Sequence, residues 1–194
     1  MKKVDQTRAT ILDESLSQGA IRGFQAVSLA DLARSTGLSK SAVFKHFGSK
    51  EGLELATIQT LCDRFYAQVW LPASREASGE RRLKAIFSGW LDWVEAGCGI
   101  IQAQIEFDDQ PGEVQKHLRA QQKLWARQLS LEFKAAGSPD AKLNAFELRG
   151  IVLAFNQAHR LMRERSARSM ANAAYTNLMQ RVRLTAIDTG RADT

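Results

Sequence analysis

The residues best placed to contact a ligand lie in the segment GLSKSAVFKHFGSKEGL, residues 37–53. It combines lysines, a histidine and phenylalanines, but it holds no glycine-rich phosphate loop, metal-ligand cluster or pair of carboxylates. Lysine ammonium groups donate hydrogen bonds to phosphates and to guanine edges, and small residues between them allow a close approach. This chemistry is that of binding rather than of catalysis.

Residue types that serve catalysis or metal binding are dispersed over the rest of the chain. Asp108 and Asp109 have no HxxxH or ExxH pattern beside them, and His117 and His159 lie further along. The two aspartates more simply favour the N-terminus of a helix that begins near Pro111. Neither cysteine has a histidine nearby in sequence, and no GxSxG or P-loop motif occurs. We therefore expect no metal, no cofactor and no enzyme activity.

Composition sets broad limits on the class of protein. The chain has 194 residues, 44% of them apolar, and a net charge of +6. The basic excess is spread along the chain, so by itself it supports a nucleic-acid partner only weakly. Cys62 and Cys98 lie far apart without a CxxC spacing, which favours a reduced, cytoplasmic protein. We expect no signal peptide and no membrane span, because no suitable apolar run occurs.

Apolar residues recur at helical spacing almost throughout, so the sequence predicts an all-α fold. Ser28, Ser39 and Ser49 precede apolar runs where they can act as N-caps, and Gly37 and Gly48 can end the helices before them. The first helix is expected from about residue 7 to 21, and the next three begin at the capping serines. The fourth helix is expected to continue to about residue 71.

The second and third helices have the spacing of a helix-turn-helix. Counting from Leu29, the fifth residue is Ala33, the ninth is Gly37 and the fifteenth is Val43. The motif needs a small residue where the helices cross, a glycine in the turn and an apolar residue in the core. The third helix then turns a small and basic face outward, formed by Lys40, Ser41, Ala42, Phe44, Lys45 and His46. Such a face suits the major groove of DNA, and the alternative is an ordinary solvated face.

At this point a family resemblance can be stated. FQAVSLADLARSTGLSKSAVFKHFGSKEGL resembles the DNA-binding domain of the tetracycline-repressor (TetR) family of transcriptional regulators, over about residues 7–60. The shared features are Gly37, the aromatic-x-x-Phe end of the short helix and the Ser-Lys-Glu start of the next. The resemblance implies that Lys40, Ser41 and Ala42 face the bases. It implies contacts to the DNA backbone from Phe44, Lys45, His46 and Lys50. Ser28, at the N-terminus of the second helix, lies where its hydroxyl and the free amides can hold a phosphate, and Ser39 is a further candidate contact. The family usually has tyrosine at position 44, so the phenolic hydroxyl that would donate a hydrogen bond to a phosphate is missing here.

The predicted organisation is a helix-turn-helix domain over residues 1–60 and a larger helical domain over residues 61–194, with PASREASGE as the clearest linker. Two apolar stripes at helical spacing mark the second domain, formed by Leu148, Ile151, Phe155 and Met162 and by Tyr175, Met179 and Val182. Spacing alone leaves open whether these stripes pack within one chain or between two chains. The resemblance implies that they form a four-helix interface of a homodimer.

Aromatic and amide side chains gather in the middle of the chain. Trp90, Trp93 and Gln104 are candidates to line an apolar pocket with a few polar groups, although such aromatic residues are as often simply core. The resemblance implies an effector site in this region. The effector itself is not identified by the sequence.

The sequence therefore predicts a cytoplasmic, homodimeric regulator, most simply a repressor that binds a palindromic operator and is released by a small-molecule effector. Two alternatives remain open at this stage. One is an all-α binding protein or enzyme whose N-terminal part docks on another protein. The other is an architectural DNA-binding protein without an effector.

Overall fold

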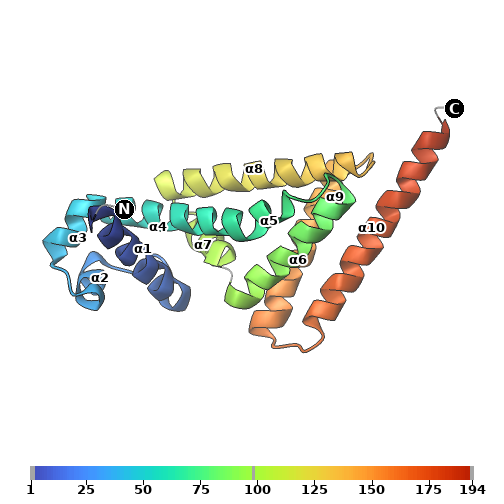
Figure 1. Cartoon of the computed structure of the whole chain (residues 1–194). Helices are drawn as coiled ribbons and strands as arrows, with labels where there is room; N and C mark the ends of the chain where they lie inside the picture. Colours follow the sequence, from blue (N-terminus) through green and yellow to red (C-terminus); the bar gives the residue numbers. More distant parts are fainter. Residues whose placement is uncertain (1–2, 98, 193–194) are drawn as a thin grey trace. The chain divides into compact units, whose positions relative to one another are not determined.

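The computed structural model describes residues 3–97 and 99–192, and within them every regular element is a helix (Figure 1). The prediction of an all-α fold is confirmed. No helix within these ranges combines the length and apolar character that crossing a membrane requires. The α-helices are α1 (Lys3–Arg22), α2 (Leu29–Thr36), α3 (Lys40–Phe47), α4 (Lys50–Phe65), α5 (Leu71–Ala73), α6 (Glu80–Gly97), α7 (Gly99–Phe107), α8 (Glu113–Ala135), α9 (Ala141–Asn156) and α10 (Ala167–Ala192). Two short π-helices, η1 (Tyr66–Trp70) and η2 (Gln157–Leu161), follow α4 and α9.

The helices form two compact units. Unit 1 joins Met1–Arg64 to Gly99–Gln121, and unit 2 joins Phe65–Cys98 to Gln122–Thr194. This division differs from the predicted boundary after residue 60, because α7 and the start of α8 group with the N-terminal helices. The reason is a set of contacts between segments far apart in sequence, which helical periodicity cannot reveal.

The core of unit 1 is formed where α1, α2, α3 and α4 meet. Its buried side chains are Ile11, Val27, Leu32, Ala33, Val43 and Leu53, with Leu29, Leu38 and Phe47 packed against them. The inward positions that the helix-turn-helix spacing predicts are therefore correct. Helices of eight residues, such as α2 and α3, are only marginally stable alone. Packing their apolar side chains into a shared core therefore stabilises both helices.

Hydrogen bonds tie α7 to the first part of unit 1. The side-chain amide of Gln102 donates to the carbonyl of Gly19 over 3.0 Å. The carboxylate of Glu106 accepts from the backbone N–H of Gln25 over 3.1 Å. These bonds hold α7 against the end of α1 and the loop that follows it.

Unit 2 is built on α6, which packs against α9, while α9 packs against α10. Ion pairs at the surface join the same helices. Arg168 of α10 contacts Asp92 and Glu95 of α6, each over 2.7 Å, and Arg183 pairs with Glu80 over 2.7 Å. Such exposed pairs contribute little individually, so apolar packing carries most of the stability of the unit.

The most deeply buried charge in unit 2 is the carboxylate of Glu132 on α8, which is 2% exposed. It accepts hydrogen bonds from Ser78 Oγ at 2.7 Å, Gly79 N at 3.0 Å, Arg82 Nη1 at 3.0 Å and Gln128 Nε2 at 2.8 Å. Burial acts to raise the pKa of Glu132, but the bonds from Ser78, Gly79 and Arg82 outweigh it and hold the pKa below its usual value. The carboxylate thereby anchors the loop that precedes α6.

We predict that Glu132→Gln lowers the free energy of unfolding by about 2–3 kcal/mol at pH 7, because Arg82 loses its buried partner. A carboxylate with a lowered folded-state pKa stabilises the fold above its unfolded pKa, about 4.3. The difference between wild type and variant should therefore shrink as the pH falls below about 4. Urea unfolding at several pH values measures this. The matched control Glu113→Gln, at an exposed pair with Lys116, should stay within about 0.5 kcal/mol of wild type. Equal effects of the two variants would contradict the prediction.

Candidate nucleic-acid interface

The turn between α2 and α3 has the geometry that a helix-turn-helix requires. Gly37 adopts φ 69° and ψ 20°, in the left-handed region, and its N–H donates to the carbonyl of Ala33. A residue with a Cβ is strained at this φ. The turn ends α2 and lets α3 cross it at the small side chain of Ala33, which is buried.

Serine side chains cap α2 and α3, as predicted. Ser28 Oγ accepts from the N–H of Asp31 over 3.1 Å and donates to its carboxylate over 2.7 Å. The hydrogen bond from Ser28 holds the pKa of Asp31 below its usual value. Ser39 Oγ accepts from the N–H of Ala42 over 3.1 Å and lies 3.0 Å from Ser41 Oγ. The Ser28 hydroxyl already donates a hydrogen bond within the cap. A phosphate at this point would therefore accept hydrogen bonds from the free amides of the first turn of α2.

α3 presents one buried and one open face. Val43 is fully buried, whereas Lys40, Ser41 and Lys45 are exposed. Phe44 is 52% exposed, so it does not fill the core and lies on the same open side as the lysines. Two further predicted contact residues, Ala42 and His46, are half-buried at the border of this face.

A cation–π contact anchors the end of α3 to α1. The guanidinium of Arg8 lies over the ring of Phe47, 5.3 Å from its centroid. Phe47 also packs against the core of unit 1, so it holds α3 from inside while the open face stays free. No sequence signal marked Arg8, because the contact joins residues that lie far apart in the chain.

The structure corrects the prediction for Lys50. Its ammonium group contacts the carbonyl of Val27, lies 3.4 Å from the carbonyl of Phe24 and pairs with Glu54 over 3.0 Å. These three partners use the three donors of the group. Lys50 therefore ties the loop before α2 to the start of α4, so its ammonium group is engaged within the chain rather than standing free on the open face of α3.

A neighbouring residue of the same Ser-Lys-Glu segment also has an internal role. Glu51 Oε1 accepts from the backbone N–H of Glu113 over 3.1 Å, at the first residue of α8. This bond caps α8 with a carboxylate from α4, which is favourable at the positive end of a helix. Sequence spacing did not indicate it, because the two residues are far apart along the chain.

In unit 2, Trp90 and Trp93 lie on α6, are 9% exposed each, and contact the ring of Phe65. The third residue predicted for the pocket, Gln104, lies on α7 in unit 1 and is half-buried. In unit 1, the thiol of Cys62 on α4 is largely buried, which raises its pKa to about 11 and keeps it protonated. Cys98 lies outside the described residues.

The predicted dimer stripes need a correction. Leu148, Phe155, Met179 and Val182 are each no more than 3% exposed within a single chain. They cannot lose further area to a partner, so the alternative of packing within one chain is correct for these four. The reason is that α9 turns this stripe toward α6 and α10 of its own chain.

The other three residues of the predicted stripes have different surroundings. Tyr175 stacks on Phe87 of α6 with ring centroids 4.3 Å apart, so it too packs mainly within the chain. Met162 follows η2 and is 58% exposed. Ile151 is half-buried and lines a groove between α9 and α10.

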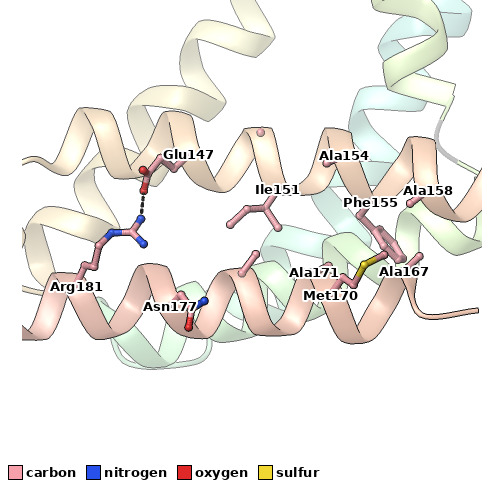
Figure 2. A pocket seen from close by; sticks show the side chains of 12 residues that line it. Glu147, Ile151, Ala154, Phe155, Ala158, Ala167, Met170, Ala171, Asn177 and Arg181 are labelled. Atoms are coloured by element: carbon pink, nitrogen blue, oxygen red, sulfur yellow. Dashed lines mark hydrogen bonds and ion pairs between the residues drawn. The ribbon is translucent and has the colours of Figure 1, made fainter. Parts of the chain in front are cut away.

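Figure 2 shows this groove from close by. It has a volume of about 640 Å³, and glycine or alanine supplies half of the residues that line it, among them Gly150, Ala154 and Ala174. Toward one end, Glu147 of α9 points to Arg181 of α10 and pairs with it over 2.6 Å (Figure 2). Small residues leave room for another helix to approach closely.

We predict that Lys50→Ala lowers the free energy of unfolding by about 1–3 kcal/mol, because carbonyls and a carboxylate lose their charged donor. The matched control Lys45→Ala, at an exposed side chain, should leave stability within about 0.5 kcal/mol of wild type. Thermal and urea unfolding of the three proteins measure both effects. Equal stabilities of wild type and Lys50→Ala would refute the internal role of Lys50.

Comparison with known proteins agrees with the fold. A crystal structure of a TetR transcriptional regulator from Chloroflexus aurantiacus superimposes with a TM-score of 0.80 at 21% identity, covering 93% of this chain and 96% of that one. The regulator AibR, solved with isovaleryl coenzyme A and operator DNA, gives a TM-score of 0.70 at 24% identity, covering 86% of this chain and 96% of that one. At these identities the likeness shows the fold.

A relative known from its sequence is the HTH-type transcriptional activator FasR of Mycolicibacterium smegmatis, 28% identical over 91 residues. The match spans 47% of this chain and 42% of that activator. The family model for bacterial regulatory proteins of the tetR family matches residues 11–57, and the model for a tetracyclin repressor-like C-terminal domain matches residues 79–175, half of the chain. With both models matched in order, the chain belongs to the TetR family: it is a DNA-binding transcriptional regulator and not an enzyme.

Proposed function

We propose that the protein is a cytoplasmic, homodimeric repressor that binds a palindromic operator through α3 and is released by a small-molecule effector bound in unit 2. The observation that carries this proposal is the open face of α3, where Lys40 and Lys45 flank small side chains beside a left-handed turn. Small residues at the start of a recognition helix let its backbone approach the base edges. Ser41 and Ala42 have this size, and the lysines can contact phosphates or guanines.

The other DNA contacts that we propose depend on how far each residue is exposed on or beside α3. Phe44 offers an apolar ring, suited to thymine methyl groups or sugars, because it lacks a hydroxyl. His46 is half-buried beside Phe47, with ring centroids 6.1 Å apart, and is therefore placed at the edge of the interface. Ser28 and Ser39 supply helix N-termini at which phosphates can accept from free amides.

The homodimer rests on an apolar face that α9 and α10 leave uncovered. On α9, Leu143, Phe146 and Leu153 are 57%, 70% and 49% exposed, and their spacing of 3 and 7 places them on one side of the helix. Met170 and Leu184 of α10 are 48% and 63% exposed. We propose this face, with the groove beside it, as the dimer interface in place of the buried stripes. A two-fold axis through it would pair α9 and α10 with their copies in a four-helix arrangement.

Release by an effector requires a ligand that binds one conformation of the dimer better than another. The chain offers a covalent route between the two units, because α4 of unit 1 is followed directly by η1 and α5 of unit 2. A change in unit 2 that displaces the start of η1 would move the C-terminal end of α4. The spacing of two α3 helices in a dimer would change as a result.

Activation in place of repression is favoured by one observation, the likeness to an activator over 91 residues.

A reporter assay distinguishes the two. An operator fragment is first selected from genomic DNA with the purified protein and placed before a reporter gene. Reporter output that rises when the protein is removed supports repression, and output that falls supports activation instead. The failure to retain any specific fragment would refute both.

We predict that the double variant Lys40→Ala, Lys45→Ala weakens operator binding about 10- to 100-fold and lowers the slope of log affinity against log salt by up to about 4, because each of the two α3 helices of the dimer loses two phosphate contacts. Fluorescence anisotropy of a labelled operator across a salt series measures both. Lys123→Ala, Lys134→Ala removes the same charge from exposed positions on α8 and should leave affinity and slope near wild type. Equal losses in the two double variants would place the interface elsewhere.

We predict that Phe146→Glu, Leu153→Glu converts the dimer to a monomer, because four carboxylates would be brought together in an apolar interface. Sedimentation equilibrium gives the mass, and circular dichroism checks that the helices persist. Leu124→Glu, at an exposed position on α8, is the control that should stay dimeric. A wild-type protein that is monomeric, or a double variant that remains dimeric, would contradict the proposed interface.

A further inference from the structure

Arg8 of α1 is exposed, yet an aromatic ring fixes the position of its guanidinium group. The group lies over the ring of Phe47, with its central carbon 5.3 Å from the ring centroid. Phe47 is the last residue of α3, is half-buried and packs against the core of unit 1. A cation of α1 is therefore held at the end of the helix whose open face carries Lys40 and Lys45.

The contact with Phe47 holds the guanidinium group without neutralising its charge. A phenylalanine ring attracts a cation through its face but supplies no oxygen to accept a hydrogen bond. Arginine has five N–H donors in one plane, and this fork matches the oxygens of a phosphate. Because the ring restricts the side chain, less conformational entropy is lost when a phosphate binds than for a freely rotating cation. Arg8 is thus preorganised to donate hydrogen bonds to a phosphate.

The position of Arg8 at the end of α3 determines which phosphates it can reach. A helix with its side chains is about 10–12 Å across, and the major groove of DNA is about 12 Å wide. A helix in the groove is therefore bordered by a sugar–phosphate strand on each side. Phe44 and Lys45, within one turn of Phe47, are exposed on the open face. A cation held beside Phe47 lies at the border of that face, where a phosphate of the bordering strand can be contacted.

Charged side chains of α1 and α4 surround Arg8 on its other side. Together with Arg8, they line a hollow of about 240 Å³ and comprise Asp5, Asp13 and Arg64. Arg64 of α4 pairs with Asp13 of α1. Asp5 stands three residues before Arg8, which places it on the same side of α1. The charges of the hollow cancel, so a phosphate contact depends on where Phe47 places the guanidinium group and not on a general excess of positive charge.

We propose that Arg8 binds a phosphate of the operator backbone while Phe47 holds its guanidinium group in place, so that α1 joins α3 in the DNA interface. The inference rests on the proposed binding of DNA through α3 and adds a contact from a helix outside the helix-turn-helix. A phosphate contact carries no sequence information of its own. Arg8 therefore strengthens and orients binding, whereas the side chains on the open face of α3 select the sequence.

The first measurement is the anisotropy of a labelled, selected operator with full-length protein across a salt series. Arg8→Ala should weaken binding about 5- to 20-fold and lower the slope of log affinity against log salt by up to about 2, because a dimer holds two copies of Arg8. Arg8→Lys keeps the charge but loses the planar fork, so it should retain most of the slope and lose less affinity. Arg127→Ala, at an exposed position on α8, is the control that should stay near wild type.

The second measurement locates the phosphate with operators that carry one uncharged linkage. One phosphate in each half-site is replaced by a methylphosphonate, and the replaced position is moved along the operator. At the phosphate that Arg8 contacts, the replacement should weaken wild-type binding by about the same factor as Arg8→Ala. It should not weaken Arg8→Ala further, because the contact is already lost. At the other contacted phosphates, the replacement should weaken both proteins by equal factors.

A purely structural role of Arg8 would give a different result. If Arg8 only kept α3 in place through Phe47, Arg8→Ala would weaken binding with an unchanged salt slope, and no phosphate position would show the coupling. That outcome overturns the proposal, and so does an Arg8→Ala variant with wild-type affinity. Circular dichroism checks that the helices persist. Arg8→Gln, which keeps most of the length of the side chain and removes its charge, repeats both measurements if Arg8→Ala does not fold.

The selection of genomic fragments distinguishes this inference from the function on which it rests. A wild-type protein that retains no specific fragment overturns the proposed function. A protein that retains a specific fragment, but whose affinity shows no phosphate coupled to Arg8, overturns this inference alone and leaves binding through α3 intact. Specific retention together with one coupled phosphate in each half-site supports both.

Discussion

The left-handed turn at Gly37 is the constraint on which the DNA-binding part of the molecule depends. With φ at 69°, the chain leaves α2 and crosses it within a few residues, so that Ala33 and Val43 meet in the core. No atom of another residue lies near the position of a Cβ at Gly37, so the requirement is one of backbone conformation and not of space. Everything on the open face of α3 takes its direction from this turn and from the contact of Arg8 with Phe47.

Lys45 and Lys50 belong to the same short segment but have different roles, because they lie on different helices. Lys45 lies on the outer side of α3 and is exposed. Lys50 begins α4, where its side chain reaches the carbonyls of the loop before α2 and the carboxylate of Glu54. The first lysine is available to a partner, and the second stabilises the unit that presents it. Charge in a sequence motif therefore does not by itself identify the contact surface.

In unit 2 the same ambiguity affects apolar residues. On α9, Leu148 and Phe155 face the interior, while Phe146 and Leu153 face outward, and both pairs step by seven residues. Helical periodicity predicts two such stripes equally well. Only the positions of α6 and α10 show that the first stripe is already covered within the chain. The outer stripe stays exposed, and the groove that Figure 2 shows lies between α9 and α10.

The sequence by itself determined the features that depend on neighbouring residues. These are the helices, the serine caps at Ser28 and Ser39, the turn at Gly37, the inward Val43 and the membership of α3 in a helix-turn-helix, because capping, φ preference and periodicity act over a few residues. Tertiary structure decided the features that depend on distant partners: the internal role of Lys50, the grouping of α7 with unit 1 and the burial of the Leu148 stripe. Each of these requires a second segment to be placed beside the first, and that placement results from the packing of the whole core.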